Sequence, residues 1–132
     1  MFTGPGTAGT FNLTPYARTV LDDANGGEMW ATMGGTHSTG ANSSFTRLPN
    51  SQGTILQRGT WWTGNGTDIV FPMAFPTAVR SIVAAIVGRT NAATPFVVNL
   101  GYESQTSFAA YTTNSVTGAV VQATIRWAAE GW

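Results

Sequence analysis

The sequence predicts a mainly β protein, an antiparallel β-sandwich with a short helical segment near its N-terminus. Short segments rich in valine, isoleucine, threonine and aromatic residues are separated by turns rich in glycine, asparagine and threonine. The segments 96–102 and 120–128 alternate apolar and polar residues, as half-buried strands do. The segment 79–87 is apolar on both faces, so a second sheet layer with a third body, or identical chains, must cover it.

The first elements along the chain are two short helices. Thr14 is a suitable N-cap residue, and Pro15 fits the first helical position because its missing N–H has no partner there in any case. The Asn-Gly-Gly sequence at 25–27 ends this helix, and a second helical turn follows at 28–33. Residues 36–44 show no periodicity, and we expect a polar loop there.

Six strands follow in the rest of the chain. Pro72 and Pro76 cannot donate to a sheet ladder, so they must lie between strands. Trp127 falls on the apolar face of the last strand, which predicts a core position, and Trp132 is expected to plug the C-terminal end. The expected strands are 54–62, 67–71, 79–87, 96–102, 106–111 and 120–128.

Three of the connections between these strands should lie at one end of the sandwich. If consecutive strands run antiparallel, the first, third and fifth connections share an end. These connections are 63–66, 88–95 and 112–118, and all three are rich in threonine, asparagine and glycine. They lie away from the point where the chain enters the domain, so we expect a polar distal end.

The composition excludes several classes of partner. Charged residues make up 9% of the chain, all six cations are arginine, and the net charge is zero. Nucleic-acid binding depends on clustered cations, so it is not expected.

The absence of cysteine excludes disulfides and thiolate metal sites, and no apolar run reaches the roughly 20 residues of a membrane span. The Gly/Thr/Pro-rich start has no signal core, which indicates a fragment of a longer protein.

Several motifs together resemble a known family. Residues 15–35, PYARTVLDDANGGEMWATMGG, resemble the short helical element that often ends the shaft of phage and prophage tail fibres. The segments LPNSQGTILQRGTWW, IVFPMAFPTAVRSIVAA and IRWAAEGW resemble the C-terminal receptor-binding domain of such fibres. The resemblance implies a homotrimeric, mostly β tip at the distal end of the virion tail fibre. Such a tip attaches the tail to a bacterial surface glycan or outer-membrane protein.

The resemblance also implies a division of the chain into two parts. We expect a shaft end or linker with two short helices at 1–44 and a β-sandwich receptor-binding domain at 45–132. Two positions depart from the family pattern: Val20 stands where leucine is usual, and residues 25–28 replace an alanine-rich stretch.

Aromatic residues are the first candidates for sugar binding, because an aromatic face can stack on the apolar side of a pyranose. Trp61 and Trp62 are adjacent on a strand and therefore face opposite ways. The outward one, together with Asn65 and Asp68, is a candidate sugar platform. The alternative is that both indoles are buried, one in the sandwich and one between subunits.

The candidate receptor contacts combine this platform with the residues of the three polar connections. Ordinary turn chemistry is the alternative explanation for the asparagines and threonines among them. The predicted receptor-binding residues are Trp62, Asn65, Asp68, Arg89, Asn91, Tyr111, Thr112 and Asn114.

Neither a metal, a cofactor nor an enzyme is expected. Three copies of His37 around an axis would offer imidazole ligands, but the residue lacks a companion ligand two positions away, and we expect an exposed loop histidine. The six carboxylates form no recognisable pair for glycoside hydrolysis, and Asp22 and Asp23 suit a solvated or inter-subunit role. The alternatives to receptor binding are a purely structural trimerisation module and, third, a polysaccharide-degrading enzyme.

Overall fold

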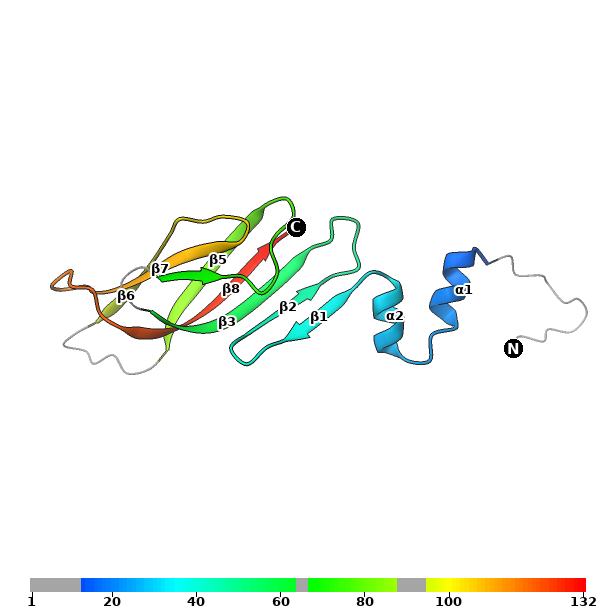
Figure 1. Cartoon of the computed structure of the whole chain (residues 1–132), viewed down its shortest axis with the longest axis horizontal. Coiled ribbons are helices and arrows are strands. Elements are labelled where there is room, and N and C mark those ends of the chain that lie inside the picture. The colour runs from blue at the N-terminus through cyan, green and yellow to red at the C-terminus, as the bar shows by residue number, and fades with distance from the viewer. Residues whose placement is uncertain (1–12, 64–66, 88–94) are drawn as a thin grey trace, which may run out of the picture. The chain divides into compact units, whose positions relative to one another are not determined.

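The structure is a computed structural model that describes residues 13–63, 67–87 and 95–132. The chain forms two compact units, Met1–Met33 and Gly34–Trp132. The smaller unit carries both helices, and the larger unit carries all the strands of the described residues (Figure 1).

The helical unit contains α1 (Pro15–Leu21) and α2 (Gly26–Thr32). The Thr14 side chain caps α1 by accepting from the Ala17 N–H at 3.2 Å, as the sequence predicts. Asn25 caps α2 by accepting from the N–H groups of residues 27 and 28, so α2 begins two residues earlier than expected. Neither helix has a buried residue, so packing of an apolar face against the other described residues contributes little to their stability.

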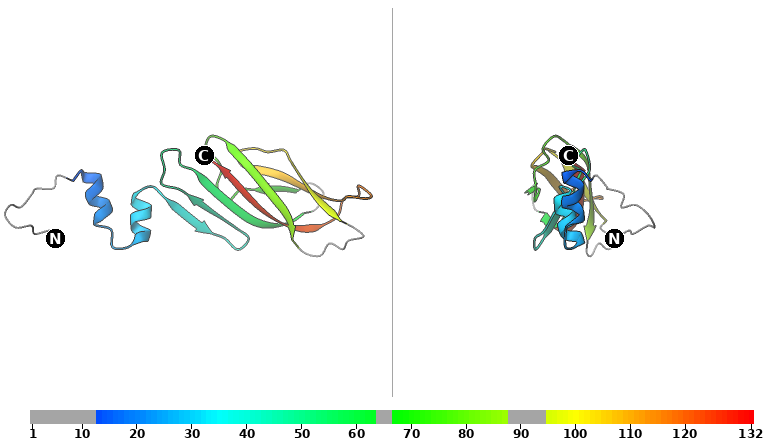
Figure 2. Two further views of the ribbon diagram at one scale, coloured as in Figure 1. Left: turned by 180° about the vertical axis from the view of Figure 1, so that it is seen from behind. Right: turned by 90° about the vertical axis from the view of Figure 1, so that its right-hand side faces the viewer.

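The larger unit holds two antiparallel sheets, one of five strands in the order β1-β2-β3-β8-β5 and one of three in the order β4-β7-β6. Figure 2 shows this unit from behind, with β5 and β8 toward the viewer. The strands are β1 (Thr36–Thr39), β2 (Ser43–Arg47), β3 (Ile55–Thr63), β4 (Thr67–Val70), β5 (Val79–Val87), β6 (Phe96–Gly101), β7 (Ser107–Asn114) and β8 (Ala123–Gly131).

The expected sandwich and its six strands are confirmed, and the bounds of 79–87 agree with β5. The expectation of a polar loop at 36–44 is wrong. This segment forms β1 and the start of β2, which pair with each other, and β2 pairs with β3 at the sheet edge. Threonine and serine suit an exposed edge strand, and backbone pairing holds it without an apolar face.

An aromatic cluster fills the space between the two sheets. The Phe71 ring centroid lies 5.0 Å from that of Phe75, 5.4 Å from that of Phe108 and 5.8 Å from that of Trp127. Trp127 is 4% exposed, which confirms its predicted core position. A Cβ at Gly59 would lie 2.7 Å from the Trp127 ring, so only glycine lets the indole lie against β3.

Strand pairing fixes which side chains face the core and which face outward on the five-stranded sheet. Ile82, Ala84 and Ile86 of β5 pack against the core, as one face of the apolar strand was expected to do. Val83, on the outer face, is 63% exposed in the single chain. The outer face of β5 is therefore not covered within the described residues.

Two buried polar contacts fix the sandwich at its two ends. The Gln57 side chain is buried and bonds both backbone groups of Met73, donating to the carbonyl at 2.6 Å and accepting from the N–H at 2.9 Å. At the other end, the hydroxyls of Thr63 and Thr112 lie 2.7 Å apart. Thr112 also donates to the carbonyl of Val121, which joins the two sheets beside the connection from β7 to β8.

Replacing Gln57 with alanine should lower the free energy of unfolding by about 2 kcal/mol, because both Met73 backbone groups lose their partner. Urea denaturation measures this change. Gln52→Ala, at an exposed position, is the control and should change stability by less than about 0.5 kcal/mol. Equal losses in the two variants would contradict the assignment.

Replacing Thr112 with valine should cost about 1 to 2 kcal/mol, because the isosteric side chain leaves the Thr63 hydroxyl and the Val121 carbonyl short of a partner. Thermal unfolding of Thr112→Val and Thr113→Val provides the comparison. Thr113 is on the opposite face of β7, and among the described residues its hydroxyl accepts a long, exposed bond from Asn99. A Thr113→Val loss as large as that of Thr112→Val would contradict this prediction.

Candidate functional site

The strand ends that flank the three polar connections lie together at one end of the sandwich, as the sequence predicts. Thr63 at the end of β3 pairs with Ala123 at the start of β8, and Val87 at the end of β5 pairs with Thr124. The chain enters this unit near Thr36, at the opposite end of the sheet. We call the first of these ends the loop end.

Trp62 is the most exposed aromatic side chain at the loop end. It is 60% exposed, and it lies on the outer face of the five-stranded sheet beside Thr124. A cleft of about 200 Å³ adjoins it, lined also by Val87, Phe96 and Gln122. An indole face next to amide and hydroxyl groups is the arrangement that stacks on a sugar ring and hydrogen-bonds its hydroxyls.

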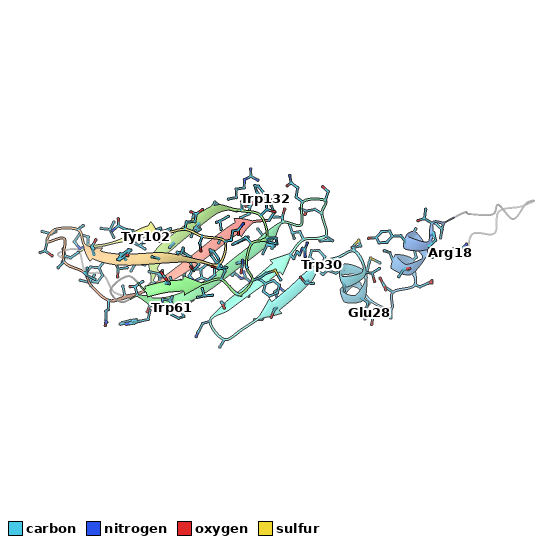
Figure 3. All side chains as sticks on the ribbon, turned by 45° about the horizontal axis from the view of Figure 1, so that its top comes forward. Arg18, Glu28, Trp30, Trp61, Tyr102 and Trp132 are labelled. Carbon is cyan, nitrogen blue, oxygen red and sulfur yellow. The ribbon has the colours of Figure 1, made fainter. Side chains whose placement is uncertain are left out.

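Trp61, labelled in Figure 3, lies on the inner side of β3 yet is still 38% exposed. Trp61 is on the inner side, as the alternative of one indole in the sandwich and one between subunits requires, but it is only partly buried. Burial of Trp62 between subunits stays a prediction. The three-stranded sheet has fewer strands than the five-stranded sheet that it covers, and it leaves Trp61 partly uncovered.

Two of the other predicted contacts, Asp68 and Tyr111, do not lie beside Trp62. Asp68 and Tyr111 are on the outer face of the three-stranded sheet, because their neighbours Ile69 and Phe108 face the core. The expectation that Trp62 and Asp68 form one platform is therefore wrong. They are on opposite layers of the sandwich.

Thr112 and Asn114 were expected in an exposed loop, and both lie in β7 instead. The Thr112 side chain is fully buried in the contact with Thr63, so it is not accessible to a receptor. The Asn114 side chain accepts from the N–H groups of Val116 and Thr117, which is ordinary turn chemistry.

The remaining predicted contacts, Asn65, Arg89 and Asn91, lie outside the described residues. Sequence reasoning missed Gln122 and Thr124 as neighbours of Trp62. Their signal was the alternation in 120–128, which sets them on the polar face of the last strand.

His37 is exposed, as expected, but it lies on β1 rather than in a loop. Its Nδ1 is 2.8 Å from the hydroxyl of Thr46, and its Nε2 is 2.9 Å from the hydroxyl of Thr39. Both ring nitrogens are therefore engaged by hydroxyl groups. Within residues 13–63, 67–87 and 95–132, no group of three His, Cys, Asp or Glu side chains is placed to hold a metal ion.

The C-terminal tryptophan completes the far end of the unit. Trp132 is half-buried, and its N–H donates to the carbonyl of Ala78, while its own carbonyl accepts from Ala78 and Thr77. The Arg80 guanidinium lies 5.8 Å from the centre of the Trp132 ring. None of the helices in the described residues has the length and apolar character needed to cross a membrane.

Solved structures share this fold. An N-truncated R2-type pyocin tail fibre is 24% identical over 98% of this chain and 55% of its own, with a TM-score of 0.62. A C-terminal piece of the R2 pyocin fibre of P. aeruginosa is 25% identical over 98% of this chain and 37% of its own, with a TM-score of 0.59. An N-truncated R1-type pyocin tail fibre is 23% identical over 85% of this chain and 100% of its own, with a TM-score of 0.58.

The chain spans about half the length of the first of these fibres. No curated protein matches it at a significant level. Residues 46–132 match the family described as "Putative tail fiber protein gp53-like, C-terminal", which accounts for most of the strand-bearing unit. The chain therefore belongs to the gp53-like C-terminal family of tail fibre proteins, and its location is the virion tail fibre.

Proposed function

We propose that this chain is the receptor-binding tip of the tail fibre and binds a bacterial surface glycan, such as lipopolysaccharide or capsule, for host attachment. The observation that carries the proposal is the exposed Trp62 beside a small cleft at the loop end of a tail fibre domain. An indole 60% exposed to water offers an accessible aromatic face, and a pyranose face is a matching partner.

A glycan is preferred to an outer-membrane protein because of the size and chemistry of this cleft. At about 200 Å³ it accommodates a small group rather than the anchor cluster of a protein interface. The polar side chains that adjoin Trp62 are Gln122 and Thr124, and an amide and a hydroxyl suit sugar hydroxyls.

We further propose that the chain acts as a homotrimer at the distal end of the fibre. Helices α1 and α2 have no buried residue, so copies packed around an axis would give them the apolar contacts that the single chain lacks. Three weak glycan sites on one tip, and several fibres on one particle, would then act together and raise avidity.

The proposed activity is binding without catalysis. Asp68 and Glu130 are exposed or partly exposed on different sheets, and Glu103 is in the connection between β6 and β7. A glycosidase would need two carboxylates facing one another across a sugar. The domain family, which is a tail fibre family, supports the same view.

A structural trimerisation module without receptor binding is the second candidate. Its support is the exposed apolar surface outside the cleft, where Val70 and Val83 are each more than half exposed. Such side chains suit contacts between subunits as well as contacts with a ligand. The two candidates differ in what loss of Trp62 should do.

Trp62→Ala should weaken binding of the fluorescently labelled chain to a susceptible bacterial strain by about tenfold per site, because the stacking surface is lost. Adsorption to whole cells measures this. Tyr102→Ala is the matched control, since Tyr102 is an aromatic side chain 81% exposed at the opposite end of the sandwich. Unchanged adsorption of the Trp62 variant would favour the structural module.

The trimer is tested by mass in solution. Size-exclusion chromatography with light scattering should give three times the 13.9 kDa of the single chain. A stable monomer would contradict the trimer, and the exposed side chains of α1 and α2 would then need another partner.

A further inference from the structure

Two arginines lie side by side on the outer face of the five-stranded sheet. Arg58 of β3 pairs with Ala128 of β8, and Thr60 of β3 pairs with Arg126 of β8. Arg58 and Arg126 are thus diagonal neighbours on one face, close enough for long side chains to reach the same point. Both residues are exposed.

Within the described residues of the strand-bearing unit, no carboxylate lies within ion-pair distance of this pair. The single ion pair of the described residues joins Arg80 to Glu130 at 3.7 Å. Residues 1–12, 64–66 and 88–94 contain no Asp or Glu, so all six acidic side chains fall within the described part of the chain. Arg58 donates its Nε–H to the Ser44 hydroxyl at 3.3 Å, which orients the guanidinium without neutralising it.

The strand-bearing unit carries a net positive charge, which also favours an anionic ligand. Residues 34–132 contain five arginines and three acidic residues, a difference of 5 − 3 = +2, in a chain whose net charge is zero. Glu130, the other diagonal neighbour of Arg58 on this face, is paired with Arg80. The guanidinium groups of Arg58 and Arg126 can therefore each donate to an oxygen of a carboxylate or phosphate.

The two arginines border a broad depression. It has a volume of about 730 Å³ and is lined by small side chains from β5 and β8, including Val83, Ala85 and Ala128. Residues 39–44, which connect β1 to β2 and begin β2, line another side with hydroxyl groups and an amide. The small side chains leave room above the sheet, so a ligand can lie beside both guanidinium groups.

Trp62 lies on the same face of the sheet as this depression. Trp62 is two residues beyond Thr60 along β3, and Thr124 precedes Arg126 by two residues along β8. Successive residues on one face of a strand are roughly 7 Å apart. The stacking surface and the two cations therefore belong to one continuous face.

We propose that an acidic polysaccharide binds across this face, with one sugar ring stacked on Trp62 and a carboxylate or phosphate of a nearby sugar held between Arg58 and Arg126. The inference rests on the proposed glycan-binding function and names its ligand class. A saccharide is favoured over a second copy of the chain because the pair lies in a hollow lined by hydroxyls and small side chains. A second copy of this unit would also bring the same surplus of positive charge.

Calorimetric titration of the full chain tests the ligand class. The probes are tetragalacturonate for a carboxylate, mannose 6-phosphate for a phosphate, and maltotetraose as the neutral control. We expect at least one acidic probe to bind more tightly than maltotetraose, with an affinity that falls as salt rises. The acidic probe that binds identifies the anionic group as a carboxylate or a phosphate. Failure of both acidic probes to exceed maltotetraose would overturn the proposal.

Paired variants test the residues. Arg58→Gln with Arg126→Gln should weaken acidic-probe binding by roughly tenfold or more, since charge-assisted hydrogen bonds are lost. The control is Arg18→Gln with Arg47→Gln, which removes the same charge at two other exposed positions and should bind as the wild type does. Equal losses in the two double variants would show a general charge effect and overturn the site.

Measurements of mass in solution and of adsorption to cells distinguish the proposed site from a subunit contact and from host attachment. Light scattering should give the wild-type mass for the Arg58 and Arg126 double variant, and a lower mass would show that this face contacts a second copy instead. Wild-type adsorption to cells by that double variant would overturn the acidic-sugar site and leave the glycan-binding function intact. Acidic-probe binding without any cell adsorption would support the site and count against host attachment.

Discussion

The packing of Trp127 between the two sheets is the contact on which the rest of the unit depends. The indole meets Phe71 and Phe108 on one side, and Gly59 of β3 makes room for it on the other. Because side chains alternate along a strand, this one inward residue sends Arg126 outward, next to Thr60. A register slip of one residue would exchange core and surface along the whole of β8. The outer face is therefore specified by the same interaction that builds the core.

Much of this arrangement could be predicted from the sequence. The alternation of apolar and polar residues predicted which side chains of β8 face the core. The two prolines of 72–76 correctly predicted the break between β4 and β5. The hairpin of β1 and β2 could not be found in this way. Its THST and SSFTR segments have no apolar face. Their stability comes from backbone pairing of β1 with β2 and of β2 with β3, which leaves no periodic signal.

The candidate site was predictable only in part, because its residues meet through register rather than through spacing. The sequence shows that Trp61 and Trp62 face opposite ways, but only the pairing of β3 with β8 decides which one faces outward. The same pairing brings Arg58 beside Arg126, which are 68 positions apart in the chain. Thr112 illustrates the reverse error. A threonine-rich segment suggested a loop, whereas its hydroxyl is needed between the sheets.

A site carried by strands differs from a site carried by loops in what binding costs. The backbones of β3 and β8 are held by nine paired positions, so Trp62 and Arg126 lose little backbone freedom when a ligand arrives. Only the long arginine side chains must be ordered, and the Ser44 hydroxyl already restrains one of them. Few charges elsewhere on the chain compete for an anion. In the proposed function, such a site would hold each sugar weakly without reorganising, and repetition of the site along the particle would then supply the strength of attachment.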